Sequence, residues 1–217
     1  MSDDSEKWHW VDVDPIEKLL QPADADDCAA GLAQFEQRHF EEAASCFRRA
    51  LQIDPGHARA LIGMGACLLH LNGLEPALAC FEQCLARGVE KNAALFGKAV
   101  ALQKMARFNE ADALYREVLR FDPDAIEPLA NLIALSVARQ DAAAVAEYSR
   151  RLLRLQPHSR AALQGLAMLA IQSGDQPASV EYCKRLVEID PDTFEGWSNL
   201  RFAQQKMRPE HPVRSIA

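Results

Sequence analysis

The sequence predicts an all-α solenoid, a stack of helical repeats, and two observations lead to that prediction. The first is an internal period of 34 residues, marked by the residue that closes each unit: Pro55, Val89, Pro123, Pro157 and Pro191. A period of about 20 to 50 residues is typical of solenoids. The second is the composition, because 49% hydrophobic residues with only 7% aromatic residues suit helices rich in alanine and leucine. We therefore expect one elongated domain whose core lies between neighbouring repeats.

Small and aromatic residues recur at fixed positions of the units, which are 24–57, 58–91, 92–125, 126–159 and 160–193. Position 8 holds Gly31, Gly65, Ala99, Ile133 and Ala167, position 20 holds Ala43, Ala77, Ala111, Val145 and Ser179, and position 24 holds Phe47, Phe81, Tyr115, Ser149 and Cys183. This pattern resembles the tetratricopeptide repeat, in which small side chains let the two helices approach closely. The resemblance covers about residues 24–207. It implies a right-handed α-solenoid of five helix-turn-helix repeats.

Both ends of the repeat array carry polar residues where the inner units are apolar. Asp27 stands at position 4 of the first unit, where the next four units all have leucine. After the fifth unit, Arg201 and Gln204 predict that residues 194–207 form a C-terminal capping helix with a polar outer side. Residues 208–217 contain two prolines and are expected to be a flexible tail or a linker.

An acidic leader, residues 1–23, precedes the repeats. Residues 1–27 hold nine acids and two bases, so their net charge of −7 equals that of the whole chain. Asp14 and Pro15 are typical of a helix start and predict a short helix over 15–21. The leader also contains Trp8, Trp10 and Val11, which need an apolar surface. We expect them to dock on the repeats, of the same copy or of another, or to pack beside the short helix at the end of the first repeat.

The resemblance also implies a concave groove, lined by the first helix of each unit. The groove positions carry mostly apolar residues: Leu32, Phe35, Arg59, Ile62, Leu69, Phe96, Val100, Asn131, Val137, Met168 and Ile171. An exposed apolar stripe on a soluble protein usually marks a binding site. The family resemblance implies a peptide or a helix as the ligand. The alternative is that individual residues of this set pack between adjacent first helices.

Metal, cofactor and nucleic-acid sites are not indicated. The six cysteines form no CxxC pair and are predicted to be packed, reduced thiols. A basic cluster lies on the second helices of the last two units and in the turn between them: Arg150, Arg151, Arg154, Arg160, Lys184 and Arg185. Glutamates interleave with it and no aromatic platform accompanies it, which favours a solvated face over a nucleic-acid site. An acidic partner, with the leader itself as one candidate, would be a further use of this cluster.

These features predict a non-enzymatic scaffold or adaptor that binds a partner peptide or helix in an apolar concave groove. Two alternatives stay open, a regulatory or targeting module of a larger enzyme and a self-assembling scaffold in which the leader of one copy fills the groove of the next. No stretch is long and apolar enough to cross a membrane, and the acidic N-terminus lacks the apolar segment of a secretory signal. We therefore expect a cytoplasmic location, with no cofactor and no nucleic-acid partner.

Overall fold

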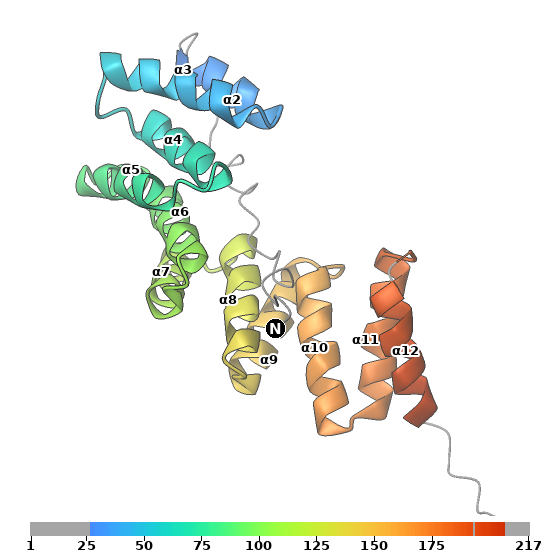
Figure 1. Ribbon diagram of the computed structural model, residues 1–217. Coiled ribbons are helices and arrows are strands. Elements are labelled where there is room, and N and C mark those ends of the chain that lie inside the picture. The colour runs from blue at the N-terminus through green and yellow to red at the C-terminus, as the bar shows by residue number, and fades with distance from the viewer. Residues whose placement is uncertain (1–26, 193, 207–217) are drawn as a thin grey trace, which may run out of the picture. The chain divides into compact units, whose positions relative to one another are not determined.

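The computed structural model describes residues 27–192 and 194–206, and its regular structure in these ranges is entirely α-helical (Figure 1). The helices are α2 (Asp27–Glu36), α3 (Phe40–Ile53), α4 (Ala58–His70), α5 (Leu74–Ala86), α6 (Lys91–Lys104), α7 (Phe108–Phe121), α8 (Ile126–Ala138), α9 (Ala142–Leu155), α10 (Arg160–Ser173), α11 (Gln176–Ile189) and α12 (Phe194–Lys206). One pair of consecutive helices occupies each predicted unit, and α12 follows the fifth pair. The all-α helical-repeat fold expected from the sequence is therefore confirmed.

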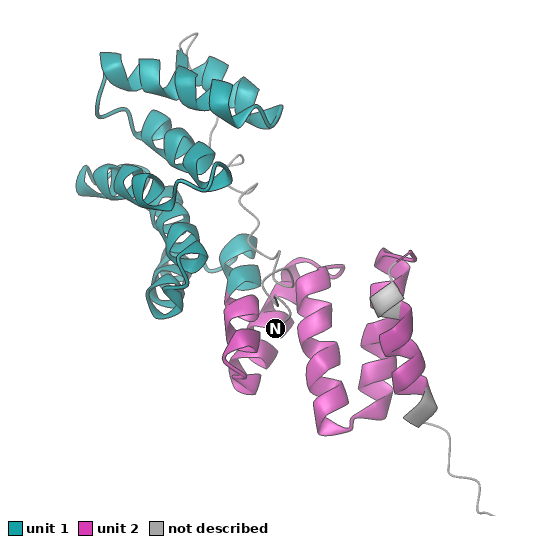
Figure 2. Cartoon of the chain, viewed as in Figure 1, with its two compact units in different colours: residues 1–131 teal, residues 132–217 magenta. Residues whose placement is uncertain are grey.

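Two compact units divide the chain, residues 1–131 and residues 132–217, with the boundary inside α8 (Figure 2). In the first unit every helix from α2 to α7 packs against the next one along the chain. The first helices of successive repeats also meet there, since α2 contacts α4 and α4 contacts α6. In the second unit, α9, α10, α11 and α12 pack in the same consecutive way.

Two phenylalanine rings connect neighbouring repeats in the first unit. The rings of Phe47 and Phe81 are completely buried. A Cβ atom added at Gly31 would lie 2.8 Å from Cε1 of Phe47, and one added at Gly63 of the next repeat would overlap the same ring. A Cβ atom added at Gly97 would likewise overlap the ring of Phe81. The glycines of two successive first helices thus provide the space for each aromatic ring, which explains why small and aromatic residues recur together in the sequence.

Helices α4 and α6 are apolar on all sides rather than on one face. Every residue from 60 to 67 of α4 is buried, and in α6 only the half-buried Lys98 interrupts the buried stretch from 93 to 102. Helix α4 achieves this burial by contacting four helices, α2, α3, α5 and α6. A helix that is hydrophobic all round belongs to a protein core. The second helices α3 and α7, in contrast, have one buried face and one exposed face.

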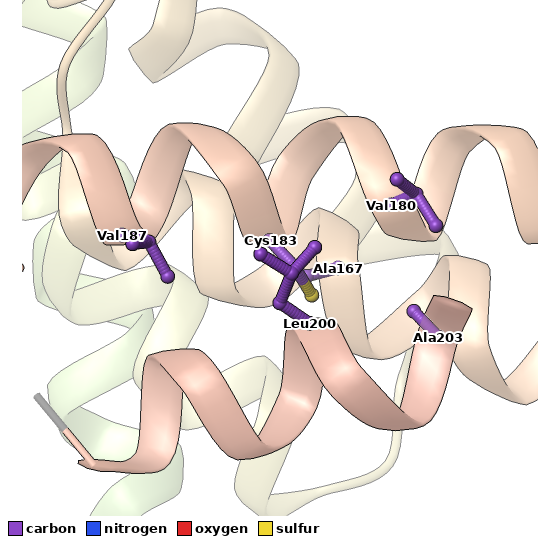
Figure 3. Close-up of a cluster of buried hydrophobic side chains, with 6 residues drawn as sticks. All are labelled: Ala167, Val180, Cys183, Val187, Leu200 and Ala203. Atoms are coloured by element: carbon purple, nitrogen blue, oxygen red, sulfur yellow. The ribbon is translucent and has the colours of Figure 1, made fainter. Parts of the chain in front are cut away.

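The end of the second unit has its own small core (Figure 3). It joins α10, α11 and α12 through Ala167, Val180, Cys183, Val187, Leu200 and Ala203. Helix α12 therefore packs on the last repeat through Leu200 and Ala203, as a capping helix does. Arg201 of this helix is exposed, as expected, but so are Trp197 and Phe202. The indole Nε1 of Trp197 donates a hydrogen bond to the carbonyl oxygen of Pro191 at 2.7 Å.

The turn between the two helices of each repeat contains a residue in the left-handed conformation. These residues are Arg38, Asn72, Ala106, Gln140 and Gly174, with φ between 57° and 75°. They occupy the same position of the five units, and only the last is a glycine. The left-handed conformation is unfavourable for residues with a Cβ atom.

We expect Ala106→Gly to stabilise the protein by about 1 kcal/mol, because glycine adopts this conformation without the steric cost. The control is Ala113→Gly, the same chemical change at an exposed position inside α7, which should destabilise by about 1 kcal/mol. Urea unfolding of both variants measures the two effects. Equal destabilisation by both variants would show that the turn does not strain Ala106.

Candidate partner-binding surfaces

Six residues of the predicted groove lie in the core of the first unit. Their exposed fractions range from 0% to 8%: Leu32, Phe35, Ile62, Leu69, Phe96 and Val100. The expectation that these side chains form an exposed stripe is therefore wrong. The alternative interpretation, packing between neighbouring helices, describes them instead. Arg59, at the start of α4, is half-buried.

Aromatic contacts show how two of these residues are held. The Phe35 ring meets the ring of Phe40 at 5.3 Å and the ring of His70 at 5.4 Å, both edge to face. The Phe96 ring lies 5.8 Å from that of Tyr115. Tyr115 is itself buried and donates a hydrogen bond from its hydroxyl group to Oε1 of Gln103 at 2.8 Å. Burial raises the pKa of Tyr115 well above its usual value. These rings are interior packing rather than a surface ready for a ligand.

The predicted groove residues of the second unit are more accessible. Val137 of α8 and Met168 and Ile171 of α10 are all half-buried. Met168 and Ile171 are three residues apart and therefore share one face of α10. Asn131, in α8 at the end of the first unit, is 2% exposed. The apolar side chains that a partner could reach in this set thus lie on α8 and α10.

Gln164 belongs to the same face of α10, one turn before Met168. Its side-chain oxygen Oε1 is buried and accepts no hydrogen bond from any residue that the structure describes. Its position in the repeat places it on the groove side, but only the structure reveals that its oxygen lacks a donor. We use the name α8/α10 face for Val137, Gln164, Met168 and Ile171.

Residues of the basic cluster differ in their polar contacts within the structure. Arg160 forms an ion pair with Asp190 at 2.5 Å, and Arg185 donates to the carbonyl oxygen of Pro157 at 2.6 Å. The remaining arginines lie on one side of α9 and line a surface hollow, which we call the arginine face: Ala143, Glu147, Arg150, Arg151 and Arg154. Arg150 and Arg154 are exposed, and neither forms an ion pair with a described residue. Positive charge therefore gathers on α9 without full compensation.

Comparison with family models gives three matches, each to a model described as tetratricopeptide repeat. They cover residues 34–91, 93–125 and 130–193. The chain belongs to the tetratricopeptide repeat family. Proteins of this family mediate protein–protein interactions, and the repeat is a non-catalytic interaction module. No curated protein matches the chain significantly in sequence.

Solved tetratricopeptide repeat structures resemble the chain over most of its length. PilF of Pseudomonas aeruginosa has a TM-score of 0.70 and 18% identity, and the match covers 89% of this chain and 91% of PilF. PilW, a type IV pilus biogenesis factor, has a TM-score of 0.66 and 20% identity over 80% of this chain and 78% of its own. YrrB, described as having an unusual peptide-binding site, has a TM-score of 0.63 and 15% identity over 81% and 90%. At these sequence identities, the structural similarity shows a shared fold.

Cysteines of this tetratricopeptide repeat protein are part of its packing. All six are free thiols, and five of them are buried. Burial raises the pKa of the Cys67 thiol to about 12 and also raises the pKa values of Cys80, Cys84 and Cys183. A thiol with a raised pKa is a poor nucleophile and a poor metal ligand at neutral pH. Within residues 27–192 and 194–206, no cluster of histidine, cysteine or acidic residues could hold a metal ion.

Several predictions concern parts of the chain outside the described residues. These are the leader with its short helix 15–21, the docking residues Trp8, Trp10 and Val11, and the tail 208–217. In the part of the chain that the structure does describe, no helix has the length and apolar character needed to span a membrane.

Proposed function

We propose that this protein is a non-enzymatic scaffold that binds a partner polypeptide, and that the partner contacts the α8/α10 face. The observation that carries the proposal is the buried Oε1 atom of Gln164, which has no donor among the described residues. Half-buried Met168 and Ile171 supply apolar surface on the same side of α10 as Gln164, and half-buried Val137 supplies apolar surface on α8. The tetratricopeptide repeat family supports the general role, since its members bind proteins. The cytoplasmic location expected from the sequence stays a prediction.

A polypeptide suits this face for chemical reasons. A buried carbonyl oxygen without a hydrogen bond costs about 1–3 kcal/mol, so a ligand that donates to Gln164 Oε1 once this half-buried side chain turns outward recovers that free energy. Every residue of a polypeptide except proline offers a backbone N–H group. The thioether of Met168 adapts to differently shaped side chains of the partner. The face therefore has the properties for holding a peptide backbone. Apolar contacts with the partner's side chains would then determine which partner it prefers.

The substitution Gln164→Leu tests this proposal, because its two expected effects have opposite signs. It removes an unsatisfied buried acceptor, so the free protein should be equally stable or slightly more stable in urea unfolding. It also removes the hydrogen bond to the partner, so capture of partner proteins by the immobilised chain should fall by about tenfold.

The matched control is Gln172→Leu, which makes the same change at an exposed position of α10 and should leave capture unchanged. A photo-crosslinker placed at Met168 should label the captured partner, whereas one placed at Gln172 should label it weakly. Unchanged capture by Gln164→Leu, or loss of capture that follows loss of stability, would contradict the proposal.

A further inference from the structure

The arginine face of α9 carries positive charge that the described residues do not fully compensate. Arg150 and Arg154 are four residues apart, so their like charges stand one turn from each other and repel. Glu147 is the single acid among the residues that line the hollow. Some other cations in the structure are paired, such as half-buried Lys98 with Glu82 and exposed Arg107 with Glu110. A bound acidic segment would offset the repulsion on α9.

We propose that the arginine face binds residues 1–26 of a second copy of this chain, which are the acidic leader and the three residues that follow it. These residues contain eight acids and two bases. Asp27, the next acid, is already engaged by Arg49 at 2.6 Å and so belongs to the repeats rather than to the leader. Guanidinium groups bind carboxylates with paired hydrogen bonds, which makes an arginine face a suitable receptor for such a segment. This contact uses α9 and is independent of the α8/α10 face.

The distribution of charge along the chain favours a contact between copies. Residues 1–131 hold 22 acids and 13 bases, a net charge of −9, whereas residues 132–217 hold 9 acids and 11 bases, a net charge of +2. The N-terminal part of one copy and the C-terminal part of another therefore attract each other over distances comparable to the Debye length. Such a contact joins different surfaces on the two copies and is a head-to-tail interface.

The surface first expected to receive the leader is not accessible. If Trp8, Trp10 and Val11 dock on the repeats, the first groove positions after them in the sequence are Leu32 and Phe35, but these two side chains are 8% and 1% exposed. Leu32 and Phe35 therefore offer the leader no accessible surface. The arginine face is exposed and hollowed, and it has the opposite charge.

Sedimentation velocity of the full chain over a range of concentrations tests the proposal. We expect association that strengthens with protein concentration and weakens when salt rises from about 0.05 M to about 0.5 M. The variant Arg150→Ala/Arg154→Ala should weaken the association constant by about tenfold. The control Lys184→Ala/Arg201→Ala removes the same charge from exposed positions of the same unit and should leave association unchanged.

A charge exchange makes the test specific. Arg150→Asp/Arg154→Asp should abolish association, and combining it with Asp12→Arg/Asp14→Arg in the leader should restore it. Circular dichroism of each variant verifies that the helices are intact. Three results would overturn the proposal: a chain that stays monomeric at every concentration, equal weakening by the two alanine pairs, or association that persists after deletion of residues 1–26.

Discussion

Replacing Phe96 with glutamate is expected to destabilise the protein by about 4 kcal/mol or more, because a carboxylate would replace a buried aromatic ring. Phe96 is 3% exposed and packs against the buried ring of Tyr115. Neither side chain can turn toward water without opening the contact between α6 and α7, which pack together. Urea unfolding followed by circular dichroism measures the loss of stability.

The matched control for this variant is Met168→Glu, which introduces the same charge at a half-buried position of the α8/α10 face. We expect it to cost less than half as much stability, because the carboxylate can reach water. It should also abolish partner capture while the protein stays folded. A Phe96→Glu variant that stays stable but no longer captures the partner would contradict the placement of Phe96 in the core. It would show that Phe96 belongs to the partner-binding groove.

Removing the ring of Phe81 is the second change with a large expected effect. Phe81 is completely buried between Gly65 and Gly97, so Phe81→Ala should leave a cavity and cost about 3–5 kcal/mol. The control is Phe121→Ala, the same truncation at a residue that is 53% exposed and interacts with Lys91 through its ring face. That variant should cost about 1 kcal/mol or less.

A double substitution tests whether Phe81 and Gly97 form one packing unit. A Cβ atom at Gly97 would overlap the Phe81 ring, so Gly97→Ala alone should destabilise by about 1–3 kcal/mol. In the Phe81→Ala background the new methyl group enters the cavity and its cost should vanish. The two effects are therefore expected to be non-additive by at least about 1 kcal/mol. Simple additivity would show that the ring and the glycine do not share space.

The repeats were predictable because the information that specifies them is local. Position 8 takes a small residue and position 24 an aromatic residue in the early units, since the ring of Phe47 needs the space beside Gly31. The closing residues at a constant spacing then place the turns. As a result, the structure begins α4 at Ala58 and α10 at Arg160, the first residues of their predicted units. The exposed surface of α12 was less predictable, because Trp197 and Phe202 are exposed as well as Arg201.

The accessible surface, in contrast, was decided by the tertiary structure. Leu69 and Ile171 occupy the same position of their repeats, yet Leu69 is fully buried and Ile171 is half-exposed. Val100 and Met168 form a second such pair. The sequence determined that each of these residues is apolar and lies on the first helix of a repeat. It could not determine their exposure, because that depends on how many neighbouring helices cover the face, as four helices contact α4.

The tertiary structure also decides which charged and polar groups find a partner. Arg150 and Arg160 look alike in the sequence, but only Arg160 finds a carboxylate, on Asp190 thirty residues away. Likewise, the missing donor at Gln164 Oε1 is a property of its surroundings rather than of its residue type. Repetition along the chain therefore determined the fold of this protein, since helix pairs depend on local spacing. Contacts between residues distant in sequence decided which surfaces remain open to a partner.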